Sequence, residues 1–352
     1  MKVAKPFSPN KRDCDLLKTV FEHRFLSTEL LQALLTEPPR EGRTYGFGSS
    51  AVKARCEKLR EHGYLTRQFI ADWPAGRGYT APRPAVYSLG TRSADVLPDL
   101  YGIDRHEVRD ILKGNTRGSH FLRHALAIGR FRATLEKACR ESGGRVELLW
   151  RQGRILKDTI ELQDDRGEPE RLSVWPDGFF ALKSGGKTAH FFLEVDQTTE
   201  PLERIQTKAR ALWHYYHGQN FARKYYYEPD AVGGKRLLVR RTEKLESRQA
   251  ALPSNRQNGA LEPISRFQVL FVVRPSLQDY ELLASGESPL RRRQRNMVAA
   301  VRMLEDLPEV TKHFWFASEL DFELSRPASI FEDVWQSLPP DTTLHSLLEG
   351  SG

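Results

Sequence analysis

Two short apolar runs of the chain each carry a carboxylate at a place where a buried strand would normally have none. Residues 175–180 include Asp177, and residues 191–196 include Glu194 and Asp196. Burying an unpaired carboxylate is costly, and a divalent metal ion is a common partner for it. If the two runs pair as a hairpin, Asp177 comes beside Glu194, in a geometry that holds Mg²⁺ or Mn²⁺ against a phosphate. The pattern therefore predicts a nuclease site.

Two further residues extend this predicted site. Asp196 shares a strand face with Glu194, because side chains alternate along a strand, and is predicted as a third metal ligand. Lys208 lies at the sheet-facing edge of the next predicted helix and is predicted to stabilise charge on the phosphate. The alternatives remain open: Asp177 with Gly178 is also a turn signal, Glu194 could pair with an arginine, and Lys208 could be a surface lysine.

Charge and composition narrow the class of protein. The formal net charge of +8 favours a polyanionic partner, most simply nucleic acid, although an excess of arginine also serves solubility. The sequence contains no apolar run long enough for a transmembrane helix and no apolar signal-peptide core. Its three cysteines form no CxxC pair. We therefore predict a cytoplasmic protein without a membrane anchor or a cysteine-bound zinc.

The first part of the chain, residues 1–92, is predicted to be a winged helix-turn-helix. Apolar spacing indicates two short helices within residues 11–36 and a third over 49–63, and residues 64–66 and 85–89 are typical of two wing strands. The third helix would enter the major groove and the wing would lie along phosphates. A winged helix used only for protein contacts is the alternative. The residues predicted to bind DNA are Lys53, Arg55, Lys58, Arg60, Arg67, Arg77 and Arg83.

The rest of the chain is predicted to be an α/β domain. A linker over residues 93–118, with a short helix at about 105–112, leads into residues 119–325, where the expected order is helix, three strands, helix, strand, helix, strand. Helices on both sides of a mixed central sheet would follow from that order. A basic, partly flexible insert is expected at about 218–263, and residues 326–352 are expected to form a tail.

The winged helix, the Pro176-Asp177-Gly178 tripeptide and the run from Phe192 to Asp196 together resemble the replication-relaxation family of mobile elements. More distantly, they resemble MOBC-type plasmid relaxases. Those proteins are similar to the PD-(D/E)XK, restriction-endonuclease-like fold, which implies that Asp177 and Glu194 are metal ligands. The family lysine expected two residues after the glutamate is Asp196 here. Either Lys208 has taken over its role, or the site binds DNA without cutting it.

The predicted function is that of a metal-dependent DNA endonuclease or nickase of relaxase type, acting on plasmid or mobile-element DNA. Asp177, Glu194, Asp196 and Lys208 would form its catalytic set with Mg²⁺ or Mn²⁺. Double-stranded DNA is the expected partner; single-stranded DNA, a second copy of the chain and plasmid-transfer or replication proteins are further candidates. The alternative is a non-catalytic replication or transcription factor whose nuclease-like domain is a scaffold.

Overall fold

The chain forms two compact units, residues 1–137 and 138–352. None of the described helices combines the length and the apolar character needed to cross a membrane. The computed structural model describes residues 7–35, 49–70, 84–115, 117–163, 166–197, 200–229, 235–240, 262–274, 289–302, 312–338 and 343–349.

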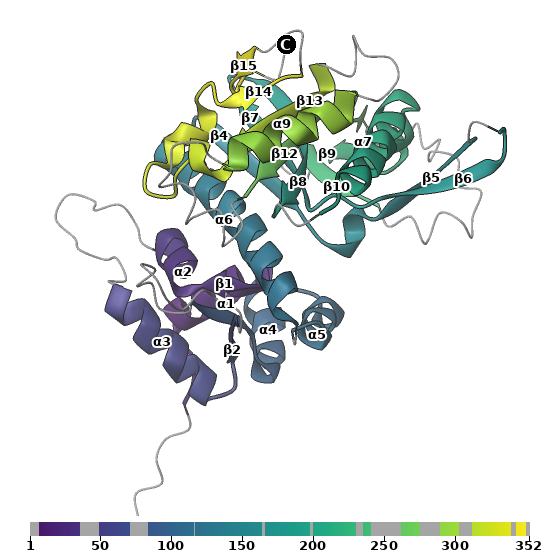
Figure 1. Ribbon diagram of the computed structural model, residues 1–352. Helices are drawn as coiled ribbons and strands as arrows, with labels where there is room; N and C mark the ends of the chain where they lie inside the picture. The colour runs from purple at the N-terminus through teal and green to yellow at the C-terminus, as the bar shows by residue number, and fades with distance from the viewer. Residues whose placement is uncertain are drawn as a thin grey trace, which may run out of the picture. The chain divides into compact units, whose positions relative to one another are not determined.

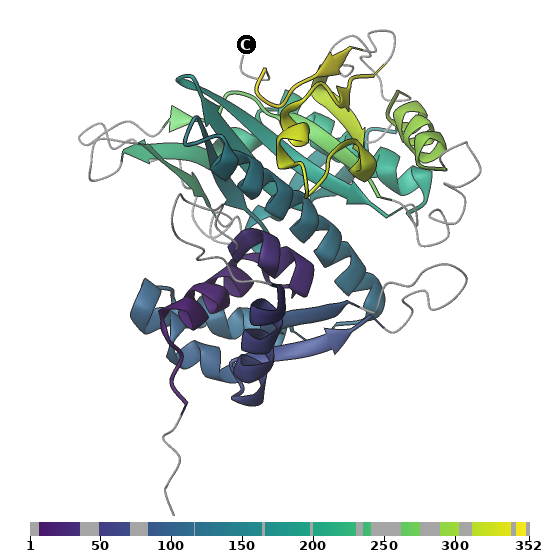
Figure 2. The same ribbon diagram turned by 90° about the vertical axis from the view of Figure 1, so that its left-hand side faces the viewer.

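The first unit places three helices beside a small antiparallel sheet, seen from two sides in Figures 1 and 2. The sheet has the strand order β1-β3-β2. The elements are α1 (Lys11–His23), β1 (Leu26–Ser27), α2 (Thr28–Leu35), α3 (Ser49–Glu61), β2 (Leu65–Phe69) and β3 (Ala85–Leu89). The three helices and both wing strands predicted from apolar spacing are present. The two-residue strand β1 is too short to leave a periodic signal.

Residues 93–118, predicted as a linker, contain short helices that pack on the first unit. They are η1 (Thr91–Asp95), α4 (Leu97–Tyr101) and α5 (Arg105–Lys113), followed by α6 (Ser119–Glu141). Leu97 and Val108 are fully buried. The Tyr101 hydroxyl donates to Asp15 at 2.7 Å, and the Asn115 side-chain amide donates to the Leu89 carbonyl at 2.6 Å. One apolar side chain in each short helix, reinforced by these hydrogen bonds, fixes the segment.

The second unit is built on a seven-stranded mixed sheet of order β15-β14-β13-β12-β8-β7-β4. Strands β4, β7 and β8 are antiparallel, whereas β8, β12 and β13 are parallel. The strands are β4 (Val146–Arg151), β7 (Gly178–Ser184), β8 (Lys187–Asp196), β12 (Gln268–Val273), β13 (Phe314–Ser318), β14 (Trp335–Gln336) and β15 (Leu344–His345). The last two come from residues 326–352, so this predicted tail contributes to the sheet. Each of them is only two residues long, which hides it from pattern analysis.

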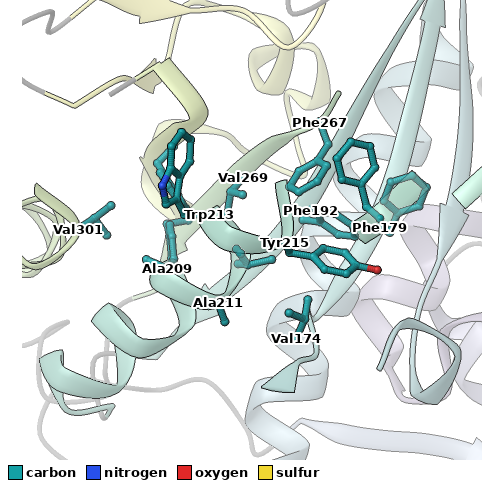
Figure 3. Close-up of a cluster of buried hydrophobic side chains, with 14 of the residues drawn as sticks. Val174, Phe179, Phe192, Ala209, Ala211, Trp213, Tyr215, Phe267, Val269 and Val301 are labelled. Atoms are coloured by element: carbon teal, nitrogen blue, oxygen red, sulfur yellow. The ribbon is translucent and has the colours of Figure 1, made fainter. Parts of the chain in front are cut away.

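One face of this sheet is covered by two neighbouring helices, α7 (Leu202–His217) and α9 (Pro289–Arg302). Phe192 and Val269, which are register partners on β8 and β12, share a buried cluster with Tyr215 of α7 (Figure 3). Since side chains alternate along β8, Glu194 and Asp196 project from this same core face as Phe192. The predicted site residues therefore lie between the sheet and its covering helices.

Two insertions add strands outside the main sheet. Strands β5 (Asp158–Gln163) and β6 (Pro169–Val174) form a two-stranded ribbon that the sequence did not predict, and it extends outward in Figure 1. The insert predicted as flexible contains a three-stranded sheet of β9 (Tyr225–Pro229), β10 (Lys235–Val239) and β11 (Glu262–Pro263). Short 3₁₀ turns complete the described elements: η2 (Arg154–Leu156), η3 (Asn220–Arg223), η6 (Glu319–Asp321) and η7 (Pro327–Phe331). Residues 230–234 and 241–261 of the insert lie outside the described chain.

Candidate functional site

The β7–β8 hairpin positions the two carboxylates that the sequence singled out. Its two-residue turn, Gly185-Gly186, has φ of +56° and +79°, and glycine adopts such values without strain. The register pairs Gly178 with Leu193, and the Asp177 N–H donates to the Leu193 carbonyl at 2.9 Å. Asp177 thus precedes β7 by one residue and extends the antiparallel pairing. The hairpin predicted from the two apolar runs is confirmed.

Asp177 is fixed against β8 by a backbone hydrogen bond. Its Oδ2 accepts from the Val195 N–H at 2.8 Å, which turns the carboxylate toward the strand that carries Glu194. The adjoining Gly178 is a strand residue, not part of a tight turn. A Cβ at this position would lie 2.8 Å from the Trp150 ring, so glycine is required by close packing. The tripeptide serves to place Asp177 at the start of a core strand.

Glu194 meets the ammonium group of Lys208, which α7 brings over the sheet. Lys208 Nζ lies 3.1 Å from Glu194 Oε2 and 3.0 Å from Glu200 Oε2. Glu194 is only 4% exposed. Burial, together with the nearby charges of Asp177 and Glu200, raises the pKa of Glu194 to about 7 against the opposing effect of Lys208. The ammonium group of Lys208 therefore bridges two carboxylates, and Glu200 also pairs with Arg204.

Lys208 itself stays protonated at neutral pH. Burial lowers the pKa of its ammonium group, but the charges of Glu194, Asp177 and Glu200 outweigh burial and raise it. The structure therefore brings three of the four predicted catalytic residues into one cluster. Lys208 could be predicted because it lies at the edge of the apolar stripe of α7 that faces the sheet.

Asp196, the fourth predicted residue, is held by an arginine from α9. Arg293 Nε lies 2.7 Å from Asp196 Oδ2 and Arg293 Nη2 lies 3.2 Å from Asp196 Oδ1, a two-pronged ion pair. Arg293 also donates to the Glu200 carbonyl. From the sequence, Arg293 was assigned no role at this site. The available signal was its spacing of four from the buried Met297 and eight from Val301, which puts it on the packed stripe of the helix.

Two residues at this site carry oxygen atoms that suit a divalent cation. The oxygens of Asp177 and Glu194 suit Mg²⁺ or Mn²⁺, with water and phosphate completing the coordination. Burial is the largest cause of the raised pKa of Glu194, followed by the charges of Asp177 and Glu200, and a bound cation would favour the ionised form. Both oxygens of Asp196 are hydrogen-bonded to Arg293, so Asp196 does not fit the set. Within the described part of the chain, no group of three or more His, Cys, Asp or Glu side chains is arranged to hold a metal.

In the first unit, Arg55 is used within the fold. Its Nε lies 2.6 Å from Oδ1 of Asp13, and a second guanidinium nitrogen contacts Oδ2. Asp13 is 1% exposed and also closes the capping box at the start of α1, together with Asn10. The arginine is thus the counter-charge of a buried acid, which opposes its predicted role in binding DNA.

Two other arginines of the predicted DNA-binding set surround Glu57. Arg60 Nε lies 2.8 Å from Glu57 Oε2, Arg67 contacts Glu57 Oε1, and the Tyr87 hydroxyl donates to the same oxygen at 3.0 Å. Burial tends to raise the pKa of Glu57, but these hydrogen bonds and charges lower it overall. Arg60 and Arg67 are therefore partly neutralised on the surface that the sequence assigned to DNA.

The two lysines of the predicted set are exposed on α3. Lys53 and Lys58 lie on the solvent side of the helix, and Lys58 Nζ lies 4.9 Å from the centre of the Phe7 ring. Arg77 and Arg83 fall outside the described residues. Of the predicted DNA contacts that the structure describes, the lysines are the more accessible ones.

Comparison with known proteins gives one family. The replication-relaxation family matches residues 17–231, more than half of the chain. The matched range contains the hairpin and Lys208, but not Arg293 of α9. No curated protein and no solved structure matches the chain. The chain therefore belongs to the replication-relaxation family, which indicates a DNA-interacting role in the replication or relaxation of plasmids or mobile elements.

Proposed function

We propose that this chain is a metal-dependent DNA endonuclease of relaxase type, which nicks plasmid or mobile-element DNA. Asp177 and Glu194 hold the cation, and Lys208 is the cationic group of the same centre. The observation that carries the proposal is the 3.1 Å ion pair between Lys208 and Glu194 beside Asp177. Asp177 just before β7, Glu194 on β8 and Lys208 on α7 converge at one end of a central hairpin, as metal-assisted phosphodiester hydrolysis requires.

The order of the elements supports a PD-(D/E)XK core. Strands β4, β7 and β8 form an antiparallel meander, and α7 then crosses to β12, which runs parallel to β8. The carboxylates lie where β7 begins and β8 ends. In this proposal the family lysine has moved from the strand to α7, so that Lys208 reaches the glutamate from the helix side.

The chemistry follows from the placement of the charges. A bound Mg²⁺ or Mn²⁺ would activate water and neutralise charge on the scissile phosphate. Asp177, fixed by the Val195 N–H, and Glu194 orient that cation. The protonated ammonium of Lys208 then stabilises negative charge on the phosphate oxygens, because it is preorganised by its ion pairs. Arg293 holds Asp196 and the start of α7 in register with the site.

A winged helix-turn-helix in the first unit is the proposed targeting module. The three helices and the β1-β3-β2 sheet have the required order, with α3 as the helix that enters the major groove. Lys53 and Lys58 on α3 would contact phosphates.

A second candidate is a replication or transcription factor that binds DNA without cutting it. The observation that favours it is the Asp196–Arg293 pair, because an acid occupies the position of the family lysine and is held by an arginine. In that case the nuclease-like domain is a scaffold, and its acidic residues do not catalyse DNA cleavage.

A nicking assay decides between the two. Supercoiled plasmid carrying the element's replication origin is incubated with the protein and Mg²⁺ or Mn²⁺, and nicked circles are measured. We expect nicking by the wild type and a loss of at least about 100-fold in Asp177→Asn, Glu194→Gln and Lys208→Met, the scale on which removal of one preorganised group slows catalysis. Glu203→Gln, an exposed acid on the same helix, is the matched control and should nick normally.

Metal binding supplies a second readout that does not depend on cleavage. Mn²⁺ should raise the melting temperature of the wild type and of Glu203→Gln, but not of Asp177→Asn or Glu194→Gln. An intact plasmid that is still retarded on a gel would establish the scaffold function. Equal nicking by the wild type and by either carboxylate variant would refute the site.

A further inference from the structure

The β5–β6 ribbon carries an exposed tryptophan directly beside the candidate site. The register ends with Asp158 paired with Val174, and Lys157 and Trp175 are the adjoining residues, with Lys157 Nζ over the Trp175 ring. Asp158 and Val174 point inward and are buried, so the alternation puts Lys157 and Trp175 on the outer side. Trp175 is 54% exposed, which is unusual for the largest apolar side chain.

The indole of Trp175 is held in place despite this exposure. Its Nε1 donates to the Gly153 carbonyl at 3.3 Å, and Lys157 Nζ lies 5.6 Å from the ring centre. A fixed aromatic ring loses little conformational entropy when a planar group stacks on it. The neighbouring ammonium supplies a positive charge for a phosphate.

The ring lies a short distance along the chain from the proposed metal ligand. Trp175 is two residues before Asp177, so their Cα atoms are at most about 7 Å apart. That distance corresponds to about two steps of a stacked DNA strand, with a rise of about 3.4 Å per nucleotide. A base on the indole would therefore belong to a nucleotide one or two steps from the phosphate at Asp177.

The surroundings favour a nucleic acid over a protein surface. The next outward-facing pair on the ribbon is Thr159 with Ser173, both exposed, so Trp175 does not continue into an apolar patch on this face. An isolated aromatic ring beside a lysine is the combination that takes a base and its phosphate. In a duplex both faces of each base are already stacked, so such a ring selects unpaired bases.

We propose that Trp175 and Lys157 form a stacking platform for an unpaired base of the DNA strand that enters the site. The substrate class is therefore DNA that is single-stranded or locally melted next to the scissile phosphate. The link to cleavage rests on the proposed nuclease function, but the platform itself is a binding site that can be tested separately.

The test measures binding without cleavage. The full-length protein in EDTA is titrated with a fluorescent single-stranded oligonucleotide and with the matching duplex, and anisotropy is recorded. We expect Trp175→Ala to weaken single-strand binding by about 5- to 150-fold, the range for loss of one stacked base, and to change duplex binding less than about twofold. Trp175→Phe should retain most of the affinity. Lys157→Ala should fall between wild type and Trp175→Ala.

The matched control is Leu320→Ala, which removes another exposed apolar side chain, 47% exposed, from the same unit. It should leave both affinities unchanged. Unaltered single-strand binding by Trp175→Ala would overturn the platform, as would an equal loss for single strand and duplex. A change in the sedimentation of the DNA-free protein on Trp175→Ala would assign the ring to a protein interface instead. If the wild type fails to nick plasmid while Trp175→Ala still loses single-strand affinity, the nuclease proposal fails and the platform stands.

Discussion

Glu57 in the first unit and Glu194 in the second both form ion pairs with basic side chains. The pKa of Glu57 is lowered, whereas the pKa of Glu194 is raised. Glu57 is surrounded by Arg60, Arg67 and Tyr87, which together lower the pKa of its carboxyl group. Glu194 is more deeply buried and shares the single ammonium of Lys208 with Glu200, so its pKa is raised to about 7. The partners of Glu57 stabilise its ionised form, whereas burial disfavours the ionised form of Glu194.

The same contrast explains the basic residues of α3. From the sequence, the basic residues of this helix and of the predicted wing were expected to form one DNA-binding surface. In the structure, the arginines described there serve acids of their own unit: Arg55 pairs with Asp13, and Arg60 and Arg67 pair with Glu57. In the second unit, Lys208 contacts both Glu194 and Glu200, and Glu194 is nevertheless buried with a raised pKa. The sign of a charge in the sequence therefore does not reveal whether it is already compensated.

The largest expected effect comes from removing Arg55. The variant Arg55→Ala leaves Asp13 buried without a counter-charge and should destabilise the fold by about 3–5 kcal/mol in chemical denaturation. Lys53→Ala, an exposed residue on the same helix, should change stability by less than about 0.5 kcal/mol and weaken DNA binding. If Arg55→Ala keeps normal stability but loses affinity for DNA, Arg55 is a DNA-binding residue instead.

Glu194→Gln should change the stability of the fold in the opposite direction to Arg55→Ala. Because the folded-state pKa of about 7 lies above the unfolded value near 4.5, ionised Glu194 costs stability increasingly as pH rises from about 4.5 to 7. The variant should therefore stabilise the metal-free protein at pH 8 by up to about 3 kcal/mol, and by little at pH 4. Urea denaturation at both pH values measures this. A destabilised variant at pH 8 would show that Lys208 already compensates the charge.

The smallest effect is expected at Glu57. Its pKa is lowered in the folded state, so its stabilising effect is present above the unfolded pKa and is lost as pH falls through the folded value. Glu57→Gln should cost about 0.5–1 kcal/mol at pH 7, because the partly exposed ion pairs are screened by solvent. Thermal melts at pH 7 and pH 3 should show this difference shrinking in acid. An undiminished difference at pH 3 would assign the loss to packing rather than charge.

The parts of the site that follow local rules could be predicted from the sequence. Asp177 and Glu194 lie within a single hairpin, where alternation and the Gly-Gly turn set the geometry. Lys208 follows from the helical stripe of α7. The Arg293–Asp196 pair joins residues 97 positions apart and depends on how α9 packs over β12 and β13, which the spacing within α9 alone does not encode. The β5–β6 ribbon was missed because charged residues interrupt its short alternating pattern.

The compact β7–β8 hairpin also has a consequence for folding kinetics. A two-residue turn brings Asp177 and Glu194 together through local contacts, and hairpins of this kind close in about 1–10 μs. The contact of Lys208 requires α7 to pack on β8. The contact of Arg293 requires α9, which follows the parallel strand β12 later in the chain. Long-range parallel pairing is slow. Local contacts alone thus bring the two acids together, whereas their counter-ions depend on contacts that are distant along the chain.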